Sequence, residues 1–225
     1  MALAGVAVLT IAGQLLFPTR ARRISRALAA QRRVRVQEAS GAVRLTGRVR
    51  RAGELLRSQL SGRPCVAYEV FVYVPGATGG QSMANWLRLV DLRQACPFVI
   101  ADESGEARVD TSGPFFLALV HDRVGSTGFS RYPGKHGLLG LLLEERGFRP
   151  SNWLGFWKGF SYVEGVLKEG ELVSVGGGSA REVDPTGDKP DPRSPPERLV
   201  LRGTEALPLL ISDERAALRE PAKSR

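Results

Sequence analysis

Cysteine and histidine are scarce in this chain of 225 residues, which has two of each. Two cysteines, Cys65 and Cys96, do not suit the disulfide-built fold of a small secreted protein. A zinc site made from them with His121 and His136 would lack paired spacings such as C-x-x-C. The sequence therefore predicts free thiols, no metal and no cofactor. A disulfide between Cys65 and Cys96 remains the alternative if the domain lies in an oxidising compartment.

Acidic residues are scarce at the start of the chain. Residues 1–63 contain 13 arginines and two acids, Glu38 and Glu54, so this part carries a net charge of +11, against +9 for the whole chain. The remaining 162 residues carry −2 and are close to neutral. Basic charge that gathers at one end favours an anionic membrane surface as the partner, and nucleic acid is not expected.

Charge is absent from Ala2 to Phe17, an apolar run of 16 residues. As a helix the run is about 24 Å long, short of the roughly 30 Å hydrocarbon core of a bilayer. A cleaved signal peptide has its basic residues before the apolar run, whereas here they follow it. We therefore expect a retained single-pass anchor over residues 1–18, with the N-terminus outside and the C-terminal domain cytoplasmic. A buried or interfacial helix and a signal peptide are the alternatives.

A basic segment follows the apolar run. Ile24 to Val36 contains no proline or glycine, and residues 19–40 are predicted as a basic juxtamembrane helix, or stalk. We expect part of this segment to contact the anionic inner membrane surface. The arginines expected to do so are Arg20, Arg22, Arg23 and Arg26.

From residue 41 onward the pattern is that of β-strands. Apolar residues alternate along Cys65 to Val74, and both faces of this strand are expected to be at least half buried. Asp102 to Gly105 has the residue types of a tight hairpin turn. The segment Gly134 to Phe160 departs from the strand pattern and predicts a helical insertion. The fold class is therefore mainly β, a partly open barrel or a sandwich, and the barrel form would be OB-like.

The β domain is predicted to span residues 41–212. Within it, residues 176–197 contain five prolines and four glycines and are expected to form a mobile loop. Residues 213–225 are predicted as a C-terminal helix and tail, in which Ser212 or Asp213 can cap the helix.

Four motifs follow one another through this domain: LTGRV, LRSQLSGRPCVAYEV, PFVIADESGEARVD and EGVLKEGELVSVGG. In this order they resemble the GIDE domain, also called BAM for "beside a membrane", over roughly residues 43–212. The family includes membrane-anchored mulan-type E3 ubiquitin ligases and shorter bacterial relatives. A RING needs eight zinc ligands, and this chain has two cysteines and two histidines. The resemblance therefore implies a RING-less relative, built as an anchored β domain.

Glu164 is the candidate binding residue of the β domain. Strand alternation places it on the same face as Phe160, Tyr162 and Val166, so the carboxylate must find a partner or shift its pKa. A structural hydrogen bond or ion pair, with an arginine from the first strand as partner, is the simpler interpretation. A role in binding is the alternative.

Aromatic residues near the helical insertion form a second candidate site. Trp153, Phe156, Trp157 and Phe160 have the spacing of one helix face. Core packing explains such a stripe. The alternative is contact with the membrane interface, which suits Trp and Phe next to the GLLGLLL segment.

No catalytic constellation is evident in the sequence. The expected function is a membrane-tethered, non-catalytic β domain that binds a protein or lipid partner at the cytoplasmic membrane surface. One alternative is a subunit of a modification complex related to E3 ubiquitin ligases. Another is an OB-type ligand-binding module, although the neutral body disfavours nucleic acid as its ligand. The sequence does not predict the oligomeric state.

Overall fold

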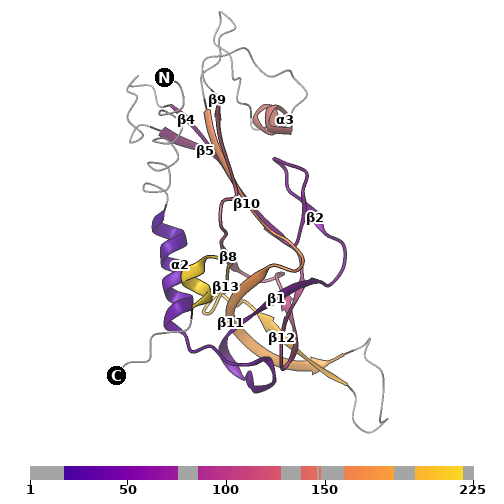
Figure 1. Ribbon diagram of the computed structural model, residues 1–225. Helices are drawn as coiled ribbons and strands as arrows, with labels where there is room; N and C mark the ends of the chain where they lie inside the picture. Colours follow the sequence, from indigo (N-terminus) through magenta and orange to yellow (C-terminus); the bar gives the residue numbers. More distant parts are fainter. Residues whose placement is uncertain are drawn as a thin grey trace, which may run out of the picture.

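The computed structural model describes residues 18–75, 86–127, 138–145, 147, 160–184 and 196–219. Most of these residues form strands in two main sheets (Figure 1). Of the predicted anchor over residues 1–18, residues 1–17 lie outside the described ranges, as do Trp153, Phe156 and Trp157. Within those ranges no helix has both the length and the apolar character needed to cross a bilayer.

The larger sheet contains a closed barrel of five strands. Its order is β1-β6-β7-β12-β11, and β11 pairs with β1 to close the ring. The barrel strands are β1 (Gly41–Arg51), β6 (Phe98–Asp102), β7 (Gly105–Asp110), β11 (Leu172–Val183) and β12 (Glu197–Arg202). Neighbouring barrel strands are antiparallel except for β7 and β12. The prediction of a mainly β fold with a barrel is confirmed, and the barrel is closed rather than partly open.

Two further strands extend the larger sheet from β11. They are β13 (Leu209–Ser212), which pairs with β11, and β8 (Phe115–Ala118), which pairs with β13. The barrel interior is apolar, with Leu45, Phe98 and Ile100 among its buried side chains. The predicted hairpin turn lies between β6 and β7, where Asp102 Oδ1 accepts the N–H groups of Ser104 and Gly105 at 2.7 and 3.1 Å.

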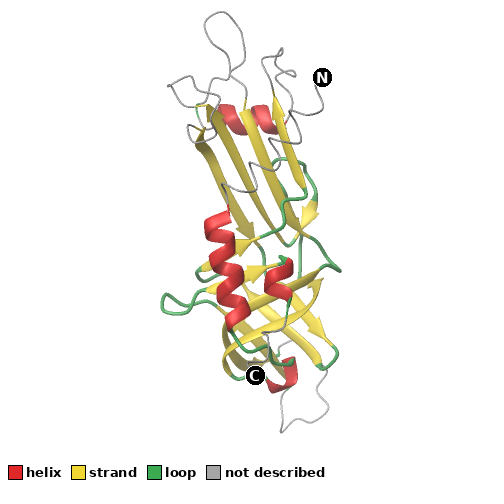
Figure 2. Cartoon of the chain, turned by 60° about the vertical axis from the view of Figure 1, so that its left-hand side comes forward, coloured by secondary structure: helices red, strands yellow, loops and turns green. Residues whose placement is uncertain are grey.

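A second sheet of four strands lies end to end with the barrel (Figure 2). Its order is β5-β4-β10-β9. These strands are β4 (Ala67–Pro75), β5 (Trp86–Ala95), β9 (Arg123–Thr127) and β10 (Phe160–Leu167), and a short pair, β2 (Leu56–Arg57) with β3 (Pro64–Cys65), lies beside them. The strand expected at Cys65 to Val74 is therefore mostly β4. Both of its faces are buried, as predicted, but in this second sheet rather than in the barrel.

The two ends of the four-stranded sheet differ. At the near end, Ala67 and Leu167 belong to the hydrophobic core of the barrel. At the other end Pro75 pairs with Trp86, and Phe160 pairs with Thr127, so the four strands end together there. We call this the far end, because it is the end away from the barrel.

The helices cover the outside of both sheets. They are α2 (Pro18–Ala30), η1 (Val36–Glu38), α3 (Leu138–Glu145) and α4 (Arg215–Leu218). Helix α3 confirms part of the helical insertion, and its Leu142 and Leu143 are buried against the four-stranded sheet. Helix α4 is the predicted C-terminal helix.

The basic helix differs from its prediction in position and packing. It ends at Ala30 because the next residues run along β1, where Val34 N–H donates to the carbonyl of Arg44 at 3.0 Å. Ile24 and Leu28 are buried against β8 and α4. This segment is thus part of the folded domain and not a freestanding stalk.

Arg44 ties both terminal helices to the outside of the barrel. Its side chain is fully buried. The acceptors of its guanidinium are Ser174 Oγ and the backbone oxygens of Leu28, Gln31, Ala217 and Arg219, at 2.6 to 3.3 Å. Carbonyls at the C-terminal ends of helices carry partial negative charge, so α2 and α4 together stabilise the buried cation.

The loop predicted over residues 176–197 is partly a strand. Gly176–Val183 belongs to β11, and residues 185–195 lie outside the described ranges. A Cβ at Gly176 would lie 2.7 Å from Gln31 Oε1 and 2.9 Å from a Leu28 methyl carbon. Glycine leaves room here for these two side chains, and a strand of glycines resembles a loop in composition.

Candidate functional site

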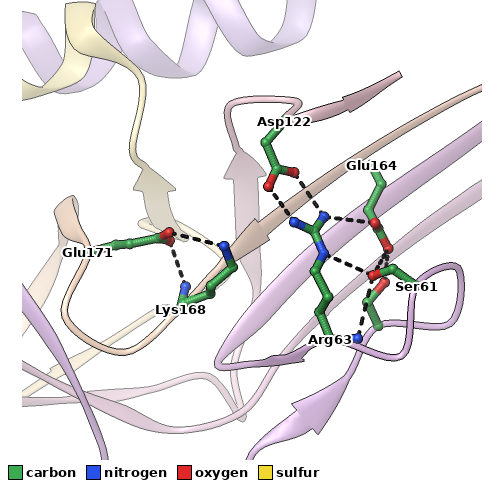
Figure 3. A network of polar contacts seen from close by, with 7 residues as sticks. Ser61, Arg63, Asp122, Glu164, Lys168 and Glu171 are labelled. Atoms are coloured by element: carbon green, nitrogen blue, oxygen red, sulfur yellow. Dashed lines mark hydrogen bonds and ion pairs between the residues drawn. The ribbon is translucent and has the colours of Figure 1, made fainter. Parts of the chain in front are cut away.

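Glu164 lies at the centre of a buried polar cluster (Figure 3). Its side chain projects from β10 on the face predicted for it, and is fully buried. Ser58 and Ser61 both donate to its Oε1, the latter at 2.9 Å. Arg63 Nη2 donates to its Oε2 at 2.8 Å. Both carboxylate oxygens are therefore engaged by the loop between β2 and β3.

Arg63 bridges two carboxylates. Besides Glu164 it binds Asp122 with both Nη atoms, one of them at 2.9 Å from Oδ1. The hydrogen bond to Asp122, followed by that to Glu164, raises the pKa of Arg63, and the same contact lowers the pKa of Asp122. Gly62, at φ 69°, makes the tight turn that lets Ser61 and Arg63 reach the same strand.

The cluster supports the structural interpretation of Glu164, with a correction to its partner. An arginine of the first strand was expected, but Arg44 binds helix ends and the partner is Arg63. Ser58 is 2% exposed, so its hydroxyl is closed to a substrate. The arrangement links two loops and β10 through hydrogen bonds. Sequence reasoning missed the two serines, Arg63 and Asp122. The Ser-x-x-Ser-x-Arg spacing in the turn could have indicated the serines and Arg63.

A second buried glutamate, Glu69, lies on the opposite face of the four-stranded sheet. Its Oε1 accepts the N–H of Leu119 at 2.9 Å and lies 3.1 Å from His121 Nε2. Its Oε2 lies 3.7 Å from Arg93 Nε. Gly165, which pairs with Glu69, leaves room for the loop, because a Cβ there would lie 2.9 Å from a backbone oxygen. His121 is in a loop, as predicted, but its contact with Glu69 was not foreseen.

The predicted membrane-contacting arginines lie on α2. Arg22, Arg23 and Arg26 are exposed on its outer face. Arg20 is exposed as well but lies over the domain, where its guanidinium carbon is 4.8 Å from the ring centroid of Phe116. The first three side chains thus remain available to an external partner.

Both cysteines are free thiols. Cys65 is fully buried, and burial raises its pKa to about 11. Burial also raises the pKa of Cys96. Since the thiolate is the reactive form, packing explains these side chains better than nucleophilic chemistry.

Comparison with known proteins finds no family model, curated protein or solved structure that matches this chain. The resemblance to the GIDE domain stays a prediction. The same holds for the interfacial role of Trp153, Phe156 and Trp157, which lie outside the described residues.

Proposed function

We propose that this chain is a membrane-tethered, non-catalytic β domain that binds a protein or lipid partner at the cytoplasmic membrane surface. The docking of α2 is the observation that carries the proposal. The helix begins at Pro18, directly after the apolar run, and Ile24 and Leu28 hold it against the domain. Its outward arginines then sit where a cytoplasmic flank of an anchor is expected to be basic.

Apolar side chains at the far end of the four-stranded sheet support a second contact with the bilayer. Leu87 on β5 is 62% exposed and Leu141 on α3 is 48% exposed. The sequence that contains Trp153 rejoins the described chain at Phe160, also at this end. Exposed apolar side chains at one end of a domain are typical of a surface that meets lipid.

The test is the topology of the full-length chain in membranes. Replacing Arg22, Arg23 and Arg26 by Gln removes three positive charges next to the apolar run. We expect a fraction of the molecules to invert, measured as protection of a C-terminal epitope from added protease. The matched control replaces Arg48, Arg50 and Arg51 on β1, which lie too far from the apolar run to set orientation.

Two results would contradict the proposal. One is extraction of the unaltered chain from membranes by alkaline carbonate. The other is equal inversion in the α2 variant and its β1 control. Crosslinking of the intact chain in its membrane would identify the partner. A conjugation component recovered there would favour the alternative of a subunit in a ubiquitin-ligase-related complex.

The closed barrel supports an OB-type ligand-binding module as a second candidate. OB domains are five-stranded Greek-key barrels that bind ligands on an outer face. Here a cavity of about 530 Å³ lies on the outer face of β6, β7 and β12. Its basic residues Arg108, Arg181 and Arg198 are matched by acids, which disfavours a polyanion. Titration with single-stranded oligonucleotides at two salt concentrations tests this, since the absence of salt-sensitive binding would exclude nucleic acid.

A further inference from the structure

Three arginines from distant parts of the chain lie around Asp91. Arg20 comes from α2, and Arg88 and Arg93 come from β5. Burial lowers the pKa of Arg20 most, Arg93 and Arg88 lower it further, and Asp91 and Glu69 raise it, so Arg20 lies near the carboxylate that Arg88 and Arg93 bind. We call these three side chains the arginine surface.

Aromatic rings support each guanidinium of this surface. Arg93 and Arg88 lie 4.9 and 5.7 Å from the ring centroid of Phe71, and Arg20 lies 4.8 Å from that of Phe116. Stacking on a ring holds the plane of a guanidinium and leaves the N–H groups at its edge available. Planar N–H edges match the oxygens of a phosphate group. The rings thus organise the arginines for anion binding before a ligand arrives.

The acids nearby do not match the three positive charges. Asp91 is shared, since its two oxygens lie 3.1 Å from Arg88 Nη1 and 2.7 Å from Arg93 Nη1. Glu69 is mostly engaged by the loop after β8, and its other oxygen is 3.7 Å from Arg93 Nε. Two carboxylates therefore face three guanidinium groups.

Hydrogen-bond donors on this surface lack acceptors. The buried Nε of Arg93 makes no hydrogen bond within the described part of the chain. Arg20 forms no salt bridge with any described residue. A buried donor without an acceptor costs free energy, and clustered cations repel one another. A bound anion would relieve the repulsion among the cations.

We propose that Arg20, Arg88 and Arg93 bind the phosphate group of an anionic membrane lipid. The inference rests on the proposed function, because α2 follows directly on the apolar run and would bring Arg20 close to the headgroups. It extends that function by specifying the lipid class, which is a phospholipid with net negative charge. Two of the three arginines that would bind it belong to the β domain. A free phosphate ester has the same chemistry, so the test separates the two sources.

The experiment measures binding of short-chain lipids to the detergent-purified full-length chain. The probe is dioctanoyl phosphatidic acid, with dioctanoyl phosphatidylcholine and glycerol 3-phosphate as comparisons. We expect saturable binding of the first. The variant Arg20→Gln with Arg88→Gln should raise its Kd at least tenfold, since both side chains are exposed and their loss spares the core. The control, Arg48→Gln with Arg50→Gln, removes equal charge from the barrel and should leave Kd unchanged.

Several results would contradict the inference. An unchanged Kd in the Arg20 and Arg88 variant overturns the inference, as does equal binding of phosphatidylcholine. Glycerol 3-phosphate that binds as tightly as the lipid would overturn the lipid assignment. Arg93→Gln provides a second variant. Its thermal unfolding shows whether the loss of Arg93 as a partner of the buried Glu69 carboxylate destabilises the fold. If lipid binding fails while the membrane topology is as expected, only this inference is wrong. If alkaline carbonate extracts the chain from membranes, the proposed function is wrong.

Discussion

The barrel and the four-stranded sheet differ in where they keep charged side chains. The barrel interior is apolar, and ion pairs such as Arg50 with Glu106 lie on its exposed outer surface. The four-stranded sheet buries a carboxylate on each face, Glu69 on one and Glu164 on the other. A closed barrel fills its own interior, whereas an open sheet needs loops to cover it. Here buried carboxylates help to hold those loops through hydrogen bonds.

Removal of Arg44 should have the largest effect on stability. Arg44→Met leaves the carbonyl ends of α2 and α4 without their donors, and we expect the free energy of unfolding to fall by about 4 kcal/mol. Urea unfolding measures the loss, and limited proteolysis should show earlier cleavage near residue 30. Arg48→Met on the same strand is the control, because its guanidinium is exposed and donates to the carbonyl of Gly170 at 2.9 Å. Equal losses in the two variants would mean that the terminal helices do not depend on Arg44.

Breaking the Glu164 cluster should have the next largest effect. Arg63→Met strands a fully buried carboxylate, and we expect a loss of about 3 kcal/mol in unfolding free energy. Adding Glu164→Gln should recover part of the loss, because the stranded charge disappears. Arg50→Met removes an exposed ion pair of the barrel and should cost no more than about 0.5 kcal/mol. Strictly additive effects of the Arg63 and Glu164 changes would refute the coupling.

The pH dependence of the free energy of unfolding tests the contact that Asp213 makes between the two regions. Asp213 accepts the N–H of Val120 at 2.7 Å, and burial raises its pKa to about 6. The native state therefore holds a proton that the unfolded state releases, so this contribution to stability is present below about pH 4 and lost as the pH rises through 6. Asp213→Asn keeps the acceptor oxygen and should gain about 2 kcal/mol relative to the unaltered chain between pH 4 and 7. A constant difference across this range would contradict the assignment.

The smallest effect concerns thiol reactivity beside the four-stranded sheet. Cys65 has 0% exposure and a pKa of about 11, whereas Cys96 is partly exposed. Native-state alkylation at pH 8 should therefore label Cys96 at least ten times faster than Cys65, as followed by mass spectrometry. In denaturant the two rates should converge. Similar rates in the native chain would show that this face opens readily.

Local patterns predicted the elements of the structure better than their partners. The hairpin at Asp102, the strand β10 and the buried face of Glu164 follow from residue types and alternation over a few positions. The partner of Glu164 could not be found this way, because Arg63 lies 101 residues away. The strand character of Gly176–Val183 was missed because its glycines give it the composition of a loop, and Gly176 lies against Leu28 and Gln31, which are far away in sequence.

The sequence by itself determined that the chain is mainly β, that a basic helix follows the apolar run, and that one strand buries a glutamate. These properties come from periodicity and composition, which act over short distances. Only the tertiary structure decided that five strands close into a barrel, that β4 joins a second sheet, and that α2 docks on Arg44. These features depend on packing and on charge pairing between residues that are far apart in the sequence. Local sequence patterns contain no information about either.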